Sequence, residues 1–291
     1  MLPCSFGSIT VRSAHLGDLP AIGRLMAPLV AQRELLARTE GEMWDLLPQS
    51  FLAEVAGRAA GFAALEIYSQ KLSEIHCLSY EESALGPEII AALLHVCLGQ
   101  AREHRIIEVM AVVPPRLEAT LTQCGFHAIL PGQKKAMFIR TGRGLAGRNE
   151  PTAQARPGDA VIRPACSDDA TSVANFLASF VARGELLPRG EEEIVTLLRH
   201  GFVAEAEERI VGFTALEIYS EKLAEVQCVS VAEAYRGQGI GRRLIMLCVK
   251  RAVQLHIAET MAITAREEIL RHCGFDESLP GAKIALFVRN R

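Results

Sequence analysis

The chain has 291 residues, enough for two domains of ordinary size that each bury a core. Its net charge of −3 gives no excess of positive charge, which argues against a nucleic acid or an anionic membrane as partner. The longest apolar run is too short to span a bilayer and the N-terminus lacks the pattern of a secretory signal, so we expect a cytoplasmic protein. The eight cysteines include no CxxC pair and no cluster with ligand spacing, so we expect no metal site. Six of them form three repeat-equivalent pairs in apolar runs, and we expect these six to be small buried thiols.

The sequence repeats itself with a period near 150 residues. The stretch GFAALEIYSQKLSEIHCLS, from Gly61, returns as GFTALEIYSEKLAEVQCVS from Gly212, with 13 of 19 positions identical. A period of this length is too long for a solenoid and predicts a duplicated domain.

The repeat predicts how the chain is divided. We expect a first domain over residues 1–141, a linker over residues 142–159, and a second domain over residues 160–291. The linker is rich in Gly, Pro and Arg and has no apolar periodicity. We also expect the two domains to pack on each other.

The elements of the second copy can be predicted in chain order, and the first copy follows the same order. Alternating apolar residues predict strands, and apolar residues at helical spacing after capping residues predict helices. The expected elements are a strand at 160–163, helices at 167–183 and 191–199, strands at 202–206, 210–219 and 224–231, a helix opened by a glycine-rich turn, a strand at 259–264, a helix at 267–272 and a strand at 283–288. This order predicts a mixed α/β fold with helices packed on a central sheet.

The turn before the long helix of the second copy reads RGQGIG, from Arg236 to Gly241. Glycines let a backbone approach a ligand, a helix N-terminus carries partial positive charge, and Arg236, Arg242 and Arg243 add full charges. This combination is typical of a site for a pyrophosphate. The alternative is that the same sequence forms only a tight turn with solvated arginines.

The first copy has lost this turn. Glu88 and Ile90 stand where the second copy has Gly239 and Gly241, and a carboxylate there would repel a pyrophosphate. The helix after it keeps its apolar spacing. We therefore expect the first copy to keep the fold without the anion site.

An Arg-x-x-Gly-x-Gly turn after the strand AEVQCVSV, with a later CGF and a closing strand, resembles the GNAT family of N-acyltransferases. The stretches GELLPR, ALEIYSEKLAEV and YRGQGIG resemble most the acetyltransferase domain of N-acetylglutamate synthases. The resemblance covers both copies and implies two tandem domains, each with a mostly antiparallel central sheet flanked by helices. It implies acetyl-CoA as cosubstrate and a small amino acid, glutamate first, as acceptor. The alternatives are a different amine as acceptor, or a non-catalytic module that binds acetyl-CoA or an amino acid.

By this resemblance the glycine turn would hold the pyrophosphate of acetyl-CoA, and the backbone of the preceding strand would hold its acetyl carbonyl and pantetheine arm. The residues so assigned to acetyl-CoA are Val229, Ser230, Val231, Arg236, Gly237, Gln238, Gly239, Ile240, Gly241 and Arg242.

The resemblance also suggests a catalytic residue. Glu225 matches the strand carboxylate that serves as general base in some members of the family, although Glu74 at the same place in the first copy also suits a structural role. The tyrosine that many members use as general acid is missing, because Ile269 and Leu270 stand at its place. A thiol with a pKa near 8.5 can leave without being protonated. Tyr219 is a distant substitute, and a tyrosine in an alternating strand is more often a packing residue.

Two basic residues, Arg189 and Lys222, match positions that hold substrate carboxylates in the glutamate-specific family, and Lys283 on the last strand is a further candidate for a distal carboxylate. An Arg fork suits a carboxylate, while the alternative is that these are solvated surface charges. Their counterparts in the first copy are Arg38, Lys71 and Lys134. The first copy could therefore still hold an amino acid without acetylating it.

Overall fold

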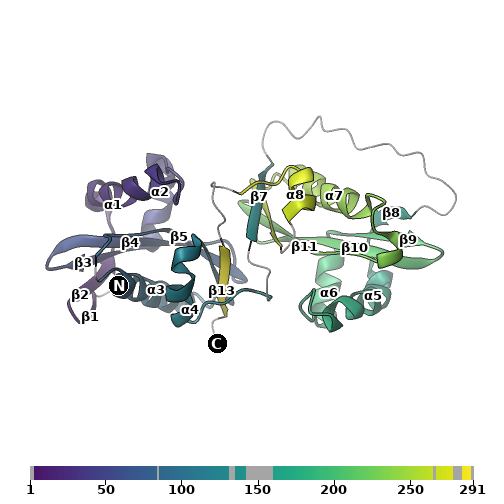
Figure 1. The fold of residues 1–291 in the computed structure, drawn as a ribbon, viewed down its shortest axis with the longest axis horizontal. Coiled ribbons are helices and arrows are strands. Elements are labelled where there is room, and N and C mark those ends of the chain that lie inside the picture. Colours follow the sequence, from purple (N-terminus) through teal and green to yellow (C-terminus); the bar gives the residue numbers. More distant parts are fainter. Residues whose placement is uncertain are drawn as a thin grey trace. The chain divides into compact units, whose positions relative to one another are not determined.

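The computed structural model describes residues 3–83, 85–130, 135–141, 160–264, 267–277 and 284–289. The chain forms two compact units, which are described separately below. Unit 1 contains Met1–Ile129 and Glu277–Arg291, and unit 2 contains Leu130–Asp276. Each unit is a sheet with helices on both faces (Figure 1), which confirms the predicted mixed α/β fold.

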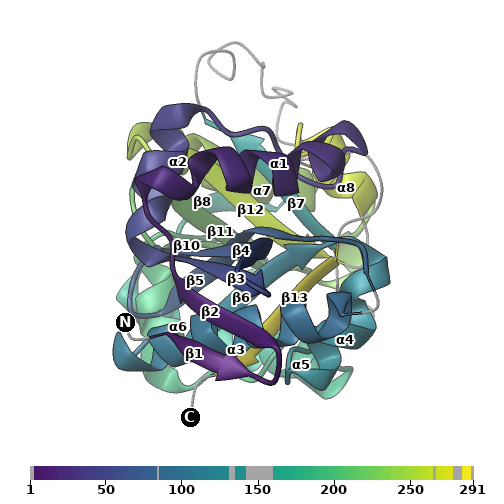
Figure 2. The same ribbon diagram turned by 90° about the vertical axis from the view of Figure 1, so that its left-hand side faces the viewer.

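The sheet of unit 1 has the strand order β1-β2-β3-β4-β5-β6-β13. The strands are β1 (Cys4–Phe6), β2 (Ile9–Ser13), β3 (Ser50–Val55), β4 (Arg58–Ile67), β5 (Leu72–Tyr80), β6 (Glu108–Val113) and β13 (Ile284–Arg289). Neighbouring strands are antiparallel, except that β5 and β6 run parallel. The helices are α1 (Leu19–Ala31) and α2 (Glu40–Leu46) on one face, and α3 (Gly86–Glu103) and α4 (Glu118–Gln123) on the other (Figure 2). Short 3-10 helices are η1 (Leu16–Asp18), η2 (Leu47–Gln49) and η3 (Pro115–Leu117).

Unit 2 repeats this plan with the strand order β7-β12-β11-β10-β9-β8. Its strands are β7 (Lys135–Arg140), β8 (Val161–Pro164), β9 (Gly201–Ala206), β10 (Arg209–Ile218), β11 (Leu223–Val231) and β12 (Glu259–Thr264). Only β11 and β12 run parallel among these described strands. Its helices are α5 (Ala170–Ala182), α6 (Glu191–Leu198), α7 (Ile240–Gln254) and α8 (Glu267–His272), with η4 (Ser167–Asp169) and η5 (Glu233–Tyr235). The predicted order of elements is confirmed.

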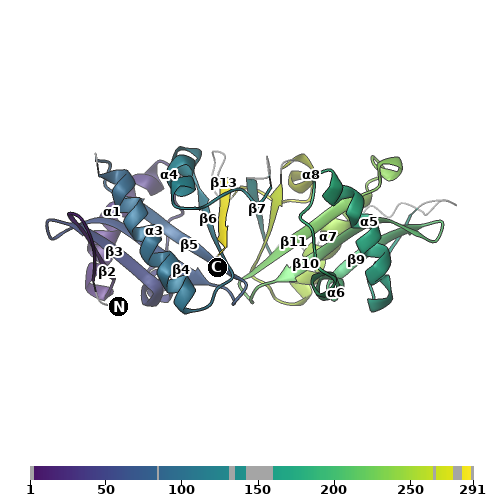
Figure 3. The same ribbon diagram turned by 90° about the horizontal axis from the view of Figure 1, so that it is seen from below.

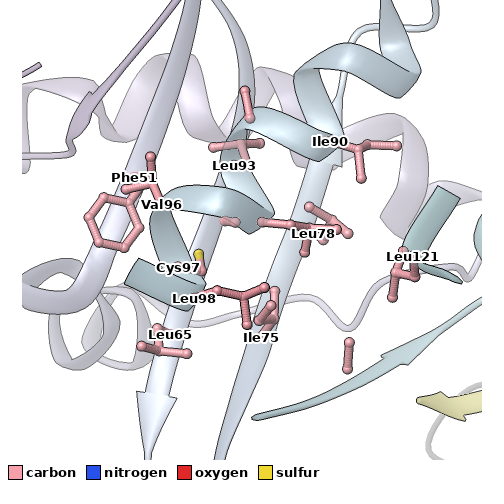
Figure 4. Packing of buried hydrophobic residues seen from close by; sticks show 14 of the residues in the cluster. Phe51, Leu65, Ile75, Leu78, Ile90, Leu93, Val96, Cys97, Leu98 and Leu121 are labelled. Atoms are coloured by element: carbon pink, nitrogen blue, oxygen red, sulfur yellow. The ribbon is translucent and has the colours of Figure 1, made fainter. Parts of the chain in front are cut away.

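Unit 1 has one apolar core between α1, α2 and the sheet, and a larger one between α3 and the opposite face of the sheet. Ile90, Leu93 and Cys97 follow one another at helical spacing on α3, and they pack toward Leu65 of β4 and Ile75 of β5 (Figure 4). A spacing of three to four residues places apolar side chains on one face of a helix, so the face that the sequence makes apolar is the face that the sheet covers. Seen from below, α3 lies across β4 and β5 (Figure 3).

All eight cysteines are free thiols. Burial raises the pKa of Cys97 on α3 and of Cys248 on α7 to about 12, so both stay protonated and act as small apolar side chains. Within the ranges that the structure describes, no helix is long and apolar enough to cross a membrane.

The last strand of each repeat lies in the unit built by the other repeat. β7 ends the first repeat but pairs with β12 of unit 2, and β13 ends the second repeat but pairs with β6 of unit 1. Their side chains enter those cores: Met137 is 0% exposed in unit 2, and Leu286 is 1% exposed in unit 1.

This exchange separates the sequence repeats from the folded units. The ranges 1–141 and 160–291 remain a prediction about the repeats, but each closing strand was expected to complete its own copy, and the structure places it elsewhere. Apolar alternation predicts that a segment is a strand without specifying its partner, and that is why the exchange was missed. The predicted linker at 142–159 lies outside the described residues, and the packing of the two domains on each other stays a prediction.

Replacing Leu286 by Ala should loosen unit 1, although Leu286 ends the second repeat. Removing a buried Leu side chain costs about 2–5 kcal/mol, so we expect faster amide hydrogen exchange in β5 and β6. Mass spectrometry of the exchanged peptides measures this. The matched change Met137→Ala should instead speed exchange in β11 and β12. If each change loosened the unit of its own repeat, the strand exchange would be contradicted.

Candidate active site

β11 and β12 run side by side only briefly. Their parallel pairing extends from Leu223↔Glu259 to Glu225↔Met261, while β11 continues to pair with β10 as far as Val231. Residues 226–231 of β11 therefore face the β12 side without a strand partner in the described part of the chain. We call this stretch the open edge of β11. A row of backbone N–H and C=O groups of this kind can pair with an extended ligand.

A β-bulge in β11 lies at the start of the open edge. Between Phe213↔Ser230 and Ala215↔Gln227 the register advances by two residues on β10 and by three on β11. Cys228, inside the bulge, has a φ of 57°. Bulges bend a strand and increase its local twist, which accounts for the separation of β11 from β12 directly before it.

The glycine turn leads from β11 into α7. Gly237 and Gly239 have φ values of 78° and 74°, a conformation that glycine adopts without strain. A Cβ atom on either would meet nothing within 4 Å, so the space beside the turn is open. Gly239, the residue preceding α7, has no side chain with which to cap the helix, and the N–H groups of a first helical turn have no partner within the helix. Buried Ile240 anchors this end of α7 in the core.

Positive side chains surround the same turn. Arg236 donates through Nε to the carbonyl of Val231 at 3.2 Å, and its Nη2 lies 3.9 Å from a carboxylate oxygen of Glu185. Arg242, in the first turn of α7, is exposed. Open space, helix N–H groups and arginines together suit a pyrophosphate group.

Glu225 is the last residue of β11 that pairs with β12, and it is 7% exposed. Tyr219 Oη donates to Glu225 Oε2 at 2.6 Å, and Gln227 Nε2 donates to the same oxygen at 2.9 Å. Burial raises the pKa of Glu225 to about 7; the two hydrogen bonds and the positive charge of Arg189 oppose this rise, and the negative charge of Glu217 adds to it. The carboxyl group therefore changes its charge near neutral pH.

Arg189 connects to the same group of side chains. Its Nη2 donates to Gln227 Oε1 at 2.7 Å, and its Nη1 lies 3.3 Å from Glu193 Oε1. Its Nε is buried and has no hydrogen-bond partner among the described residues. These side chains are called the Glu225 cluster: Arg189, Glu193, Glu217, Tyr219, Glu225 and Gln227.

The structure brings two of the predicted site residues together and leaves two apart. Glu225 and Arg189 are joined through Gln227. Lys222 is exposed on the turn between β10 and β11, where its backbone N–H donates to Ser220 Oγ at 3.1 Å, so its role at an acceptor's carboxylate stays a prediction. Lys283 lies outside the described residues.

The remaining predicted residues lie on two segments that are consecutive in the chain. Val229, Ser230 and Val231 lie on the open edge of β11, and Ser230 is buried. The glycine turn and the start of α7 hold the others: Arg236, Gly237, Gln238, Gly239, Ile240, Gly241 and Arg242.

The sequence analysis missed the polar partners of Glu225. Tyr219 was interpreted mainly as a packing residue, and Gln227 was not singled out. A signal was present, since Glu217 and Tyr219 alternate along one strand and Glu225 and Gln227 along the next. Residues two apart in a strand point to the same face, and the observed register sets Glu217 opposite Glu225.

Unit 1 has filled the space that unit 2 leaves open. α3 begins at Gly86, the counterpart of Gly237, so the residues that form a turn in unit 2 form the first helical turn in unit 1. A Cβ atom on Gly86 would lie 3.2 Å from the ring of Tyr80. Arg116 holds that ring in place, because it hydrogen-bonds to Tyr80 Oη and donates through Nε to Glu34.

Comparisons with known proteins agree with this picture. Residues 178–275 match the model of the Acetyltransferase (GNAT) family. An uncharacterised N-acetyltransferase of Chlorobaculum tepidum is 28% identical over 119 residues, which cover 41% of this chain and 77% of that protein. An amino-acid acetyltransferase of Vibrio vulnificus is 28% identical over 133 residues, 43% of this chain but only 30% of that protein.

A solved structure shares the fold over nearly the whole chain. The GCN5-related N-acetyltransferase from Sphaerobacter thermophilus has a TM-score of 0.53 and 17% identity, and the match covers 98% of this chain and 97% of that one. At this identity the likeness shows the fold alone. The family match and the relative named N-acetyltransferase identify residues 178–275 as an acetyltransferase domain of the GNAT family, for which acetyl-CoA is the acetyl donor.

Proposed function

We propose that unit 2 transfers the acetyl group of acetyl-CoA to the α-amino group of a small amino acid, with glutamate as the first candidate. The observation that carries the proposal is Glu225, a buried carboxyl group with a pKa of about 7 at the point where β11 leaves β12. The relatives named amino-acid acetyltransferase support an amino acid as acceptor, although they match this chain only in part.

The glycine turn, Arg236 and the first turn of α7 would hold the pyrophosphate of acetyl-CoA, and the open edge of β11 would hold its extended arm and acetyl carbonyl. Acetyl-CoA supplies an activated acetyl thioester there. Glu88 and the ring of Tyr80 argue against a second molecule in unit 1.

Glu225 acts as the general base in this proposal. An α-amino group with a pKa of about 7.7–8.0 is mostly protonated near neutral pH and cannot attack. Glu225 takes that proton, the amine nitrogen bonds to the acetyl carbon, and the carbon–sulfur bond breaks to release the thiolate. The hydrogen bonds from Tyr219 and Gln227 both go to Oε2, which orients Oε1 toward the amine. A base with a pKa near the working pH combines sufficient ionisation with sufficient proton affinity.

Arg189 binds the acceptor's carboxylate in this proposal. Its guanidinium is fixed by Gln227 and Glu193, and its buried Nε lacks a hydrogen-bond partner among the described side chains and backbone. A carboxylate oxygen would supply that partner.

Replacing Glu225 by Gln should keep the shape of the site and remove the base. We expect kcat near pH 7 to fall by about 10²–10⁴-fold. In the wild type, kcat/KM should rise with pH and level off above about 7, because only the ionised carboxylate accepts the proton. The mutant should lack this inflection, and steady-state rates between pH 5 and 9 measure both. A wild-type rate and pH profile in the mutant would leave proton removal to water.

The same substitution has a second readout. Burial raises the pKa of Glu225 from its ordinary 4.5 to about 7, so the stability it contributes is complete below pH 4.5 and lost as the pH rises through 7. This loss amounts to about 3 kcal/mol. Thermal unfolding should therefore show the Glu225→Gln chain gaining stability over the wild type as the pH rises from 5 to 8. A stability difference between mutant and wild type that stays the same at pH 5 and pH 8 would contradict the raised pKa of Glu225.

Replacing Arg189 by Ala should raise the KM for an acidic amino acid and leave the KM for acetyl-CoA nearly unchanged. A lost charge-assisted hydrogen bond is worth about 1.5–3 kcal/mol, or roughly tenfold to a hundredfold in affinity. Steady-state kinetics with each substrate varied in turn measures the two constants. Arg38→Ala is the matched control and should leave both unchanged; equal, small effects from both variants would mean that these arginines are only structural.

A further inference from the structure

Unit 1 contains the same group of side chains as the Glu225 cluster. The counterparts, each 151 residues earlier, are Arg38, Glu42, Glu66, Tyr68, Glu74 and His76. Only one position differs, where His76 replaces Gln227. Unit 1 has thus kept its buried polar groups while it lost the turn for a pyrophosphate. Buried charged groups cost free energy unless they are paired, so atoms of this group that lack a partner mark where a ligand would bind.

One side of His76 faces carboxylates. Its Nε2 lies 3.1 Å from Glu66 Oε2 and 3.3 Å from Glu74 Oε2. Tyr68 Oη donates to Glu74 Oε2 at 2.9 Å, as Tyr219 does to Glu225 in unit 2. Burial lowers the pKa of His76, but the two carboxylates outweigh it and raise the pKa to about 9. His76 is therefore an imidazolium at neutral pH, with a hydrogen on both ring nitrogens.

The other side of His76 faces a second cation. Arg38 Nη2 lies 3.1 Å from His76 Nδ1, where it donates a hydrogen bond when the ring is neutral and meets a second donor when the ring is an imidazolium. The guanidinium of Arg38 also lies against the Cys77 thiol, and its buried Nε has no hydrogen-bond partner in the described ranges of the chain. In unit 2 the equivalent contact is satisfied, because Arg189 donates to Gln227 Oε1 at 2.7 Å. The change from Gln to His thus leaves a place in unit 1 that calls for an anionic oxygen.

Solvent reaches this place as well as it reaches the Glu225 cluster. The side chain of Arg38 is 19% exposed and that of Arg189 is 20% exposed. The buried cations Arg38 and His76 balance the buried carboxylates of Glu66 and Glu74. A ligand that itself carries one charge of each sign leaves this balance unchanged.

We propose that unit 1 binds a free α-amino acid without acetylating it, with the ligand's carboxylate between Arg38 and His76 and its ammonium group beside Glu66 and Glu74. This inference rests on the proposed function, because it extends the assignment of the cluster to amino-acid recognition. Acetylation is not expected, since Tyr80 and the extended start of α3 fill the space for acetyl-CoA.

Binding should depend on the protonation of His76. The groups that face it are Arg38 from the loop after α1, Glu66 and Tyr68 from β4 and the following turn, and Glu74 and Cys77 from β5. Burial raises the pKa of Cys77, so its thiol adds no charge. The attraction of His76 for a carboxylate is thus present below about pH 9 and lost as the pH rises through that value.

Calorimetry on the full chain without acetyl-CoA tests the site, with L-glutamate as the first probe and the other protein amino acids in turn. We expect two sites in the wild type, one in Arg189→Ala, one in Arg38→Ala and none in the double variant. Glutarate, which lacks the ammonium group, should bind the Arg189→Ala chain at least tenfold more weakly than L-glutamate. Arg38→Lys should bind more tightly than Arg38→Ala, which separates loss of a ligand contact from loss of folding.

The outcomes distinguish the two proposals. If no amino acid binds the Arg189→Ala chain, the site in unit 1 does not exist. If Arg38→Ala abolishes all binding while Arg189→Ala retains one site, the inference stands and the acceptor site of unit 2 is wrong.

His76→Gln gives unit 1 the arrangement of unit 2 and tests the ligand geometry. In the Arg189→Ala background, we expect His76→Gln to weaken binding about tenfold at pH 7, the loss of one charge-assisted hydrogen bond. Near pH 10 the affinities of the chains with His76 and with Gln at this position should become nearly equal. Titration of the ligand itself affects both affinities alike and cancels from their ratio. A ratio that stays the same at both pH values would overturn the placement of the carboxylate against His76.

Discussion

The separation of two parallel strands is the constraint on which the rest of this structure depends. β11 leaves β12 at Glu225, and β5 leaves β6 at Ile75, in each case directly before a bulge with a cysteine in the left-handed region of φ. Strand edges left open inside a fold carry backbone groups that need partners, so an opening of this kind is stable when a ligand or a side chain occupies it. Both units have the opening, and they differ in the segment that leads out of the strand. In unit 2 this segment has glycines and an open helix start, whereas in unit 1 it is a longer helix beside the ring of Tyr80.

The second theme is the cost of burying charge. In unit 2 the buried charge is that of Glu225. Burial raises the pKa of its carboxyl group and the hydrogen bonds from Tyr219 and Gln227 lower it, so that the pKa is about 7. Unit 1 places His76 where Gln227 stands, and Glu74 and Glu66 are thereby paired with a cation. The imidazolium of His76 carries a positive charge where the side-chain amide of Gln227 is neutral, so the two clusters differ in charge at this position. One substitution thus separates a cluster suited to taking a proton from a cluster suited to holding an ion.

Much of this could be predicted from the sequence, and the failures have physical reasons. The repeat, the order of elements and the fold class followed from periodicity and from the match between the two copies. The glycine turn at the start of α7 was recognised from its glycines and arginines, and its assignment to acetyl-CoA, which came from the family resemblance, stays a prediction. The exchange of β7 and β13 did not, because their alternating side chains suit either unit equally well. Tyr219 and Gln227 were missed as partners of Glu225, since pairing across a hairpin depends on a register that the bulge at Cys228 shifts. Nor could the raised pKa of Glu225 be foreseen, because it arises from burial in three dimensions.

The central claim is that acetyl-CoA occupies the opening of unit 2 and not that of unit 1. Amide hydrogen exchange with and without acetyl-CoA measures this most directly. We expect slower exchange at residues 226–231 and 236–243 when acetyl-CoA is added, and no change at residues 75–80 and 86–92. Gly239→Glu should abolish the effect by placing a side chain and a negative charge at a left-handed position before a helix, whereas Gly239→Ala, which adds strain without charge, should only weaken it. Equal protection in both units, or none along the open edge of β11, would contradict the account.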